Sequence, residues 1–137
     1  DALFAVEAAI HFDKPTFFRA AADIGVRRIA LAEILVEDKS AVEANPYASP
    51  ALHKCWSQAE YEAGLYAAGF ELTSLRDVTA QTFRGMAEYV SGIPEAGYGE
   101  NSLILGQLKR AFLDLEVLSR IGKVRYVILS AKRRGDA

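Results

Sequence analysis

Several features that identify common protein classes are absent or scarce in this 137-residue sequence. Its one cysteine, Cys55, excludes an internal disulfide and a metal site built from cysteines alone. No apolar run reaches the ~18 residues that a membrane-spanning helix needs. The N-terminal segment has no positively charged lead and does not resemble a signal peptide. We therefore expect a soluble, cytoplasmic protein.

Charge and phosphate-binding motifs are also scarce. The formal net charge is −2, and no basic run gathers on one face, so nothing favours binding to nucleic acid. Neither a Gly-x-Gly-x-x-Gly motif, a phosphate loop nor a nucleophile elbow occurs. His53 and Cys55 form a His-x-Cys pair without further ligands nearby, so we expect no metal site.

The sequence begins directly with an apolar segment. Residues 1–13 read as a strand, then His11, then a helix start at Asp13, with no initiator Met and no polar lead-in. A length of 137 residues is below the usual size of a complete α/β enzyme domain. We expect one partial domain over residues 1–137, the C-terminal half of something larger.

Four helices are predicted from the residues at their ends. Each lies between a polar residue at its start and a glycine just past its end: Asp13 and Gly25, Ser57 and Gly69, Thr79 and Gly92, and Asn101 and Gly122. The second has the strongest signal, since Ser57 and Glu60 form a capping box and Trp56 and Tyr61 a hydrophobic staple.

Four extended segments separate these helices. Residues 2–7 and 28–36 are nearly continuous apolar runs, typical of parallel strands covered on both faces. Residues 71–78 and 124–131 are more mixed and suit strands nearer an edge. The alternation of strands and helices favours a layered α/β sheet. The long irregular stretch 37–56 follows the carboxyl end of the second strand, where open α/β sheets bind ligands.

Three titratable side chains lie at or near predicted strand ends. His11 suits proton removal at neutral pH, or it hydrogen-bonds backbone in the turn. Glu33 interrupts an apolar strand, where a carboxylate is costly unless it is paired or wet. It therefore holds His11, takes a proton itself, or marks a solvated sheet end. Glu7 accepts hydrogen bonds from a cofactor, or it caps the nearby turn.

Four aromatic residues, Tyr47, Trp56, Phe83 and Tyr98, lie in or beside the loops that would cover this end of the sheet. Aromatic walls suit a flat or apolar substrate, but loop aromatics also plug small cores. Both interpretations stay open from the sequence.

Six motifs in order give the chain a family resemblance. They lie at residues 7–12 (EAAIHF), 17–21 (FFRAA), 29–33 (IALAE), 67–71 (AAGFE), 77–81 (DVTAQ) and 126–132 (YVILSAK). Together they resemble the C-terminal half of a class I S-adenosylmethionine-dependent methyltransferase, of the small-molecule group that includes the ubiquinone-type and rebeccamycin-sugar-type enzymes. The chain departs from the family pattern by a short turn at residues 24–27 and by Glu33 in place of an aspartate.

The resemblance implies a fold and a cofactor. The fold is α/β, the C-terminal half of a Rossmann-like methyltransferase sheet, mostly parallel with its last strand antiparallel and with helices on both faces. A substrate-lid loop at 37–56 and a helical insertion at 79–122 are expected. The implied cofactor is S-adenosylmethionine, although the family's glycine-rich motif and ribose-binding acid are absent from this chain.

The resemblance also implies roles for individual residues. The reaction is methyl transfer to a small-molecule acceptor, with His11 as base and Glu33 as its orienting partner. Glu7 and Ala8 would line the donor's side. The residues expected to contact the acceptor are Tyr47, Trp56, Gln81 and Tyr98.

Two other interpretations remain. The chain is a truncated or degenerate non-enzymatic protein that keeps the half-sheet and acts through oligomerisation or partner binding, or it is an unrelated α/β small-ligand binder. An open half-sheet leaves an unpaired, apolar edge strand that associates unless it is covered. A homo-oligomer or a missing N-terminal half would supply that cover.

Overall fold

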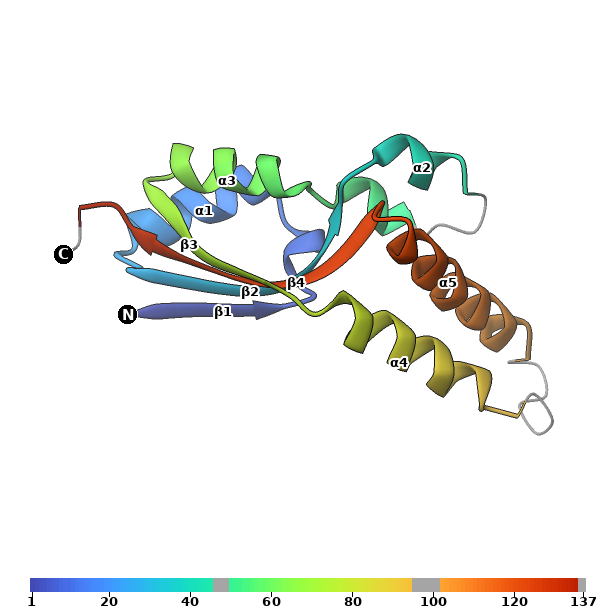
Figure 1. Cartoon of the computed structure of the whole chain (residues 1–137). Helices are drawn as coiled ribbons and strands as arrows, with labels where there is room; N and C mark the ends of the chain where they lie inside the picture. Colours follow the sequence, from blue (N-terminus) through green and yellow to red (C-terminus); the bar gives the residue numbers. More distant parts are fainter. Residues whose placement is uncertain (46–49, 95–101, 136–137) are drawn as a thin grey trace.

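A four-stranded mixed sheet organises the chain (Figure 1). The computed structural model describes residues 1–45, 50–94 and 102–135. The strands lie in the order β1-β2-β4-β3, with β1 parallel to β2 and β4 antiparallel to both of its neighbours. Their bounds are β1 Ala2–Val6, β2 Arg28–Val36, β3 Phe70–Asp77 and β4 Val124–Arg133. The predicted α/β class and the antiparallel last strand are confirmed.

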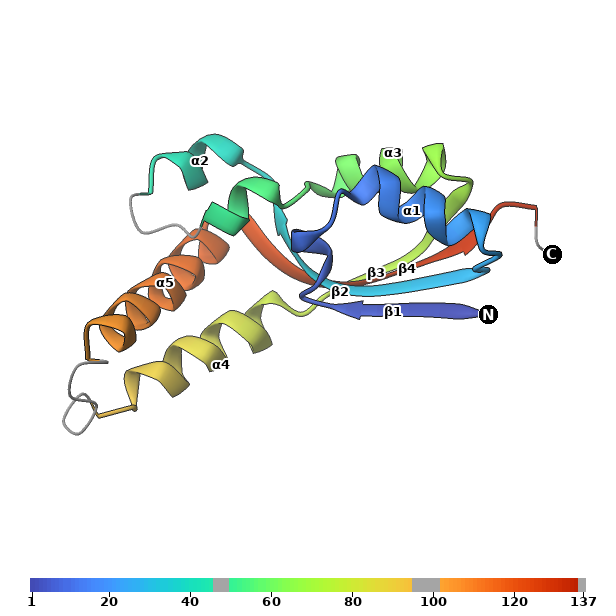
Figure 2. The same cartoon turned by 180° about the vertical axis from the view of Figure 1, so that it is seen from behind.

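Helices cover one face of the sheet and extend from its end. The helical elements are η1 Ala9–His11, α1 Lys14–Asp23, α2 Lys39–Glu43, η2 Pro50–Lys54, α3 Gln58–Ala67, α4 Thr79–Ser91 and α5 Ser102–Arg120. Helices α1 and α3 lie side by side on one face, whereas α4 and α5 project beyond the carboxyl end of β3 (Figures 1 and 2). Across the described ranges, no helix is long and apolar enough to cross a membrane.

The predicted helix ends are largely confirmed. Ser57 and Glu60 form both hydrogen bonds of the capping box, and the Trp56 and Tyr61 rings meet edge to face at 5.3 Å. Thr79 differs, because it is the first residue of α4 rather than its cap. The Asp77 carboxylate accepts a hydrogen bond from its N–H at 2.9 Å instead. Asn101 lies outside the described residues.

Two expectations about strands and loops need correction. The mixed segment 124–131 was expected near an edge, but β4 lies inside the sheet and pairs with β2 and β3. Its polar residues are tolerated there because one sheet face is uncovered. The stretch 37–56 is not wholly irregular, since it holds α2 and η2, and Asp38 caps α2 by accepting from the Ala41 N–H.

The core has two parts. One lies between the sheet and helices α1 and α3, and its fully buried members include Phe18, Leu31, Leu35, Leu65 and Leu129. The other lies at the carboxyl end of β2, between α2, α4 and α5, and includes Val36, Val42, Phe83, Leu118 and Val124. The second cluster therefore anchors the segments that flank the carboxyl end of the sheet.

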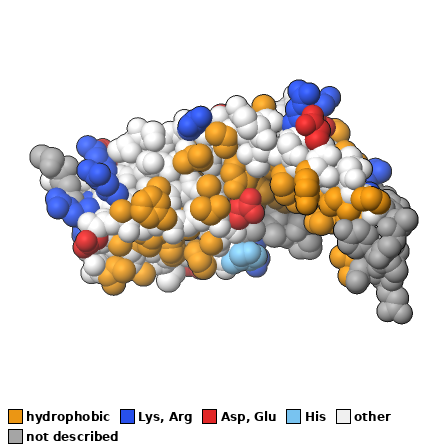
Figure 3. Space-filling model, turned by 90° about the horizontal axis from the view of Figure 1, so that it is seen from below, with side chains coloured by type: hydrophobic (Ala, Val, Ile, Leu, Met, Phe, Trp, Pro, Cys, Tyr) orange, Lys and Arg blue, Asp and Glu red, His pale blue; other side chains and the backbone are white. Residues whose placement is uncertain are grey.

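The opposite face of the sheet is apolar and open. Phe4 and Val6 of β1 are 77% and 70% exposed, and Ile128 of β4 is 41% exposed. A hollow of about 490 Å³ lies on the sheet, with Phe4 and Ala30 in its lining. Hydrophobic side chains gather across this face in Figure 3. In the described part of the chain β1 pairs with β2 alone, so its outer edge is also free.

Gly64 in α3 should resist replacement although it is helical. An added Cβ would lie 2.7 Å from Trp56 Cη2 and closer still to Cζ3. We expect Gly64→Ala to lower the free energy of unfolding by about 1–3 kcal/mol, the usual cost of overpacking. The matched variant Gly85→Ala in α4 meets no atom within 4 Å, and it should gain up to about 1 kcal/mol from helix propensity. Urea unfolding measures both, and equal stabilities would contradict the packing argument.

Candidate functional site

The carboxyl ends of β1 and β2 meet at one edge of the sheet. They are parallel neighbours with Val6 opposite Ala32, so the residues that follow β1 lie beside the end of β2. This turn carries Glu7, Ala8 and His11, three of the predicted site residues. Ligands of open α/β sheets bind at this end.

Glu7 has an unusual backbone conformation. Its φ is 50°, the single positive value among non-glycine residues in the described ranges. Its N–H still donates to the Ala32 carbonyl at 2.9 Å, so the chain turns sharply as the β1–β2 ladder ends. Such conformations cost about 1–3 kcal/mol and concentrate at functional sites.

Tyr126 fixes the Glu7 carboxylate from across the sheet. Its hydroxyl donates to Glu7 Oε1 at 2.9 Å, although the two residues lie far apart in the sequence. Tyr126 is 7% exposed, and Phe83 packs edge to face on its ring. Burial first and the Glu7 carboxylate second raise the pKa of the Tyr126 hydroxyl, which therefore stays a neutral donor. The sequence interpretation did not select Tyr126 as a site residue, although residue 126 begins the motif at 126–132.

Glu33 is fully buried on the helix-covered face. Its Oε1 accepts a hydrogen bond from the Ala9 N–H at 2.8 Å, whereas Oε2 has no hydrogen-bond partner among the described residues. Burial raises the pKa of this carboxyl, opposed by the Ala9 hydrogen bond and by the Lys14 charge. The alternative that Glu33 marks a solvated sheet end is therefore excluded.

His11 lies on the surface at the end of η1. Its backbone N–H donates to the Ala8 carbonyl at 3.0 Å, and its side chain is exposed. Within the described residues no hydrogen bond or ion pair joins His11 to Glu33. Glu33 holds Ala9 instead, two residues earlier in the same turn. The structure brings the predicted base and its predicted partner to one turn, and a direct contact between them stays a prediction.

Lys14 is a buried cation that sequence reasoning missed. It is 2% exposed, its Nζ donates to the Lys54 carbonyl at 2.8 Å, and it lies 5.5 Å from the Trp56 ring centroid. Burial lowers the pKa of its ammonium group. Burial also raises the pKa of the neighbouring Cys55 thiol to about 11. A lysine in the first turn of a helix usually keeps its ammonium group in water, so nothing in the sequence predicts this burial.

The predicted acceptor-contacting residues are dispersed. Trp56 is half-buried and packs on Phe18 and Tyr61, so it serves the core as well as the adjoining loop. Gln81 is exposed in the first turn of α4. Tyr47 and Tyr98 lie outside the described residues. Across the described ranges no three His, Cys, Asp or Glu side chains form a group that could hold a metal ion.

Comparison with known proteins finds likeness in structure. No protein-family model matches the chain, and no curated protein matches its sequence. It superposes over 97% of its length on a cyclopropane synthase from Mycobacterium tuberculosis, with a TM-score of 0.80 and 14% identity, and spans 55% of that chain. It superposes over 96% on a geranyl diphosphate C-methyltransferase from Streptomyces coelicolor, with a TM-score of 0.68 and 16% identity, and spans 46% of that chain.

A third similar structure is a phosphoethanolamine N-methyltransferase from Haemonchus contortus, which the chain matches over 97% of its length with a TM-score of 0.74 and 14% identity. The chain spans 33% of that protein, and 46–55% of the other two. The likeness establishes the fold alone, which this chain shares with part of each of these three proteins.

The raised pKa of Glu33 predicts a pH-dependent stability. As pH rises past 4.5, the ordinary pKa of a Glu, the unfolded chain loses this proton before the folded chain does. The free energy of unfolding should therefore fall until the raised pKa is passed and stay lower above it. Glu33→Gln cannot ionise and keeps an oxygen for the Ala9 N–H, so it should gain on the wild type as pH rises to neutral.

Urea unfolding at a series of pH values measures this difference. The comparison variant Glu33→Leu also removes the acceptor, and it should be less stable than Glu33→Gln at every pH by about 1–3 kcal/mol. Parallel pH profiles for wild type and Glu33→Gln would show that Glu33 does not titrate as its burial requires.

Proposed function

We propose that this chain is part of an S-adenosylmethionine-dependent enzyme that transfers a methyl group to a small-molecule acceptor, with the donor-binding half of the fold lying outside this chain. Solved methyltransferases match nearly its whole length, and two of them contain S-adenosylhomocysteine. The observation that carries the proposal is Glu7, a strained acidic residue held by Tyr126 at the carboxyl end of β1.

Glu7 and Ala8 fit one corner of a donor site. Glu7 Oε1 accepts from the Tyr126 hydroxyl, while Oε2 makes no hydrogen bond to a described residue and is available to a ligand's amino or hydroxyl group. When bound, S-adenosylmethionine supplies a methyl group that its positive sulfur has already activated. The protein then has mainly to align the acceptor and exclude water.

His11 would accept the acceptor's proton where an oxygen is methylated. Its imidazole is exposed on η1, the turn that also carries the donor-side residues. An imidazole can take up a proton at neutral pH. Glu33 would orient His11 through the backbone, because its bond to the Ala9 N–H fixes the turn.

The acceptor would lie between the two segments that flank the sheet end. These segments are residues 37–56, which include Trp56, and residues 79–122, which include Gln81. Tyr47 and Tyr98 are proposed as further residues that contact the acceptor. The acceptor class stays open, since the matched enzymes are described as acting on different small molecules and at carbon or nitrogen.

The uncovered sheet face favours a second candidate, a protein that acts through association. Phe4 and Val6 expose apolar surface beside the outer edge of β1, with which no described strand pairs. Such edges pair with other strands unless they are protected. A second copy, or the remaining half of a methyltransferase fold, would bury this face. Under the enzymatic proposal the same cover completes the donor site next to Glu7.

Calorimetric titration of the complete natural protein with S-adenosylhomocysteine tests the proposed function. We expect one-to-one binding, and Glu7→Gln should weaken it about tenfold because a charge-assisted hydrogen bond is lost. Glu71→Gln is a matched control, since Glu71 pairs with Lys132 at the opposite end of the sheet. No binding to the wild type would contradict the enzyme and favour the associating protein.

His11→Ala should separate catalysis from donor binding. We expect kcat to fall about 100-fold or more, the usual contribution of a general base, with the Kd of the donor unchanged. Wild-type turnover in this variant would leave His11 with only a role in the turn.

A further inference from the structure

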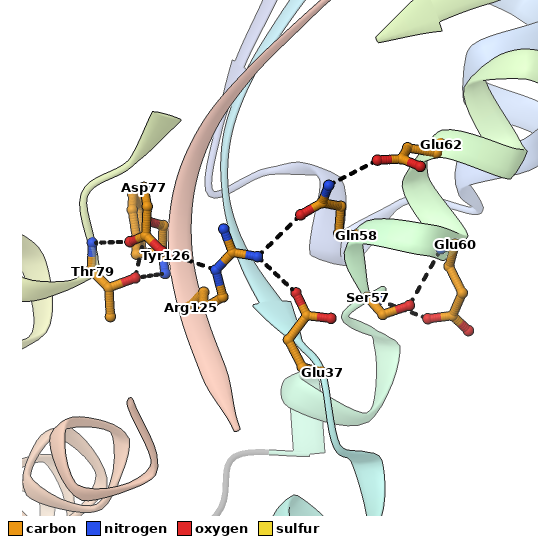
Figure 4. Close-up of polar contacts among 9 residues, drawn as sticks. All are labelled: Glu37, Ser57, Gln58, Glu60, Glu62, Asp77, Thr79, Arg125 and Tyr126. Carbon is orange, nitrogen blue, oxygen red and sulfur yellow. Dashed lines mark hydrogen bonds and ion pairs between the residues drawn. The ribbon is translucent and has the colours of Figure 1, made fainter. Parts of the chain in front are cut away.

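Two segments flank the carboxyl end of the sheet. The first and last residues of each segment, its stems, lie close together around Arg125. The first segment joins β2 to α3, from Glu37 to Gln58, and holds α2 and η2. The second joins β3 to β4, from Asp77 to Arg125, and holds α4 and α5. Figure 4 shows the side chains of these four residues meeting. They are named the Arg125 cluster below.

The Arg125 guanidinium lies at the centre of the cluster. Its Nε donates to Asp77 Oδ2 at 2.9 Å. Its Nη1 donates to Glu37 Oε1 at 3.1 Å and to Gln58 Oε1, also at 3.1 Å. The side chain is 26% exposed, so water screens these contacts only in part. One residue therefore bonds both stems of the first segment and the opening stem of the second.

Backbone contacts bring the same stems together. The Glu37 N–H donates to the Lys123 carbonyl at 2.9 Å, and the Val78 N–H donates to the Tyr126 carbonyl at 2.9 Å. Lys123 Nζ also pairs with Asp38 at 2.8 Å. The Arg125 cluster thus closes an arrangement in which neither segment is anchored independently of the other.

The chemistry of the cluster requires an arginine. A guanidinium carries several donors in a rigid plane and can bond oxygens from three directions, whereas a lysine is a point charge on a flexible stem. The cluster also sets one cation against two carboxylates. Without Arg125, Glu37 and Asp77 would face each other across the gap and repel.

We propose that Arg125 is a positioning residue that couples the two segments, so that α2 and α4 are held in place together at the carboxyl end of the sheet. The inference rests on the proposed function only in placing the acceptor between these segments. The coupling itself belongs to the fold and is measured without any ligand.

Hydrogen exchange of backbone amides in the full chain tests the coupling. In Glu37→Gln, which alters the first segment alone, exchange should accelerate about two- to fivefold both in α2 and in the first turns of α4, the range expected for a partly exposed ion pair. Asp77→Asn alters the second segment alone, and its amide oxygen can still accept from the Thr79 N–H. Exchange in this variant should accelerate in α2 as well as in α4. Amides of α1 and of α3 beyond its first turn should keep their wild-type rates; that first turn is not a control, because its Gln58 bonds Arg125.

Two arginine variants sharpen the test. Arg125→Lys keeps the charge and loses the fork, so it should loosen both segments. Arg84→Met is the control, because Arg84 pairs with Glu88 inside α4, and it should leave α2 unchanged. Acceleration confined to the mutated segment, or spread equally over α1 and α3, would overturn the proposal. Glu37→Gln decides the question even if the arginine variants fail to fold.

This test and the test of the proposed function fail separately. Coupled exchange without S-adenosylhomocysteine binding would keep the Arg125 role and reject the enzyme. Binding of S-adenosylhomocysteine without coupled exchange would keep the enzyme and reject the Arg125 role.

Discussion

The hydrogen bond from the Ala9 N–H to the buried Glu33 carboxylate connects the core of this molecule to its site. Where the β1–β2 ladder ends, the positive φ of Glu7 turns the chain and leaves the next backbone donors without strand partners. Glu33 satisfies one of them from the second strand. Burying this acid near Lys14 is costly, and a well-packed apolar pair often does as well for stability. What the arrangement secures is the position of the turn that carries Glu7 and His11.

Local signals in the sequence predicted the elements, and contacts between distant residues set the site. The Ser57–Glu60 capping box and the turn at Gly69 depend on neighbours in the chain, and both were predictable. The contact of Tyr126 with Glu7 depends on β4 lying next to β2 in the sheet. The residue pattern of β4 shows a mixed apolar strand, but it does not show that this strand pairs with β2. The burial of Lys14 was hidden for the same reason, because it depends on η2 closing over α1.

The open face of the sheet bears on both candidate functions. Phe4 and Val6 lie on β1, and Val6 directly precedes Glu7, so a surface that covers their apolar side chains would come close to the proposed donor corner. The similar structures are longer than this chain and contain it as about half or less of their length. Under the proposed function, burial of this apolar surface and completion of the donor site would therefore be coupled. The two proposals, association and methyl transfer, then depend on the same open face of the sheet.

The two anchors at the carboxyl end differ in how firmly they hold. Glu33 is fully buried, and the low polarity around it strengthens its hydrogen bond with the Ala9 N–H. Ions in solution screen this buried contact little. The Arg125 cluster is partly exposed, so water and ions weaken its ion pairs. A rigid turn suits a base that must stay aligned, whereas segments held by weaker contacts can open to admit an acceptor. The fold thus places a fully buried polar contact under the proposed chemistry and partly exposed ones under the proposed cover.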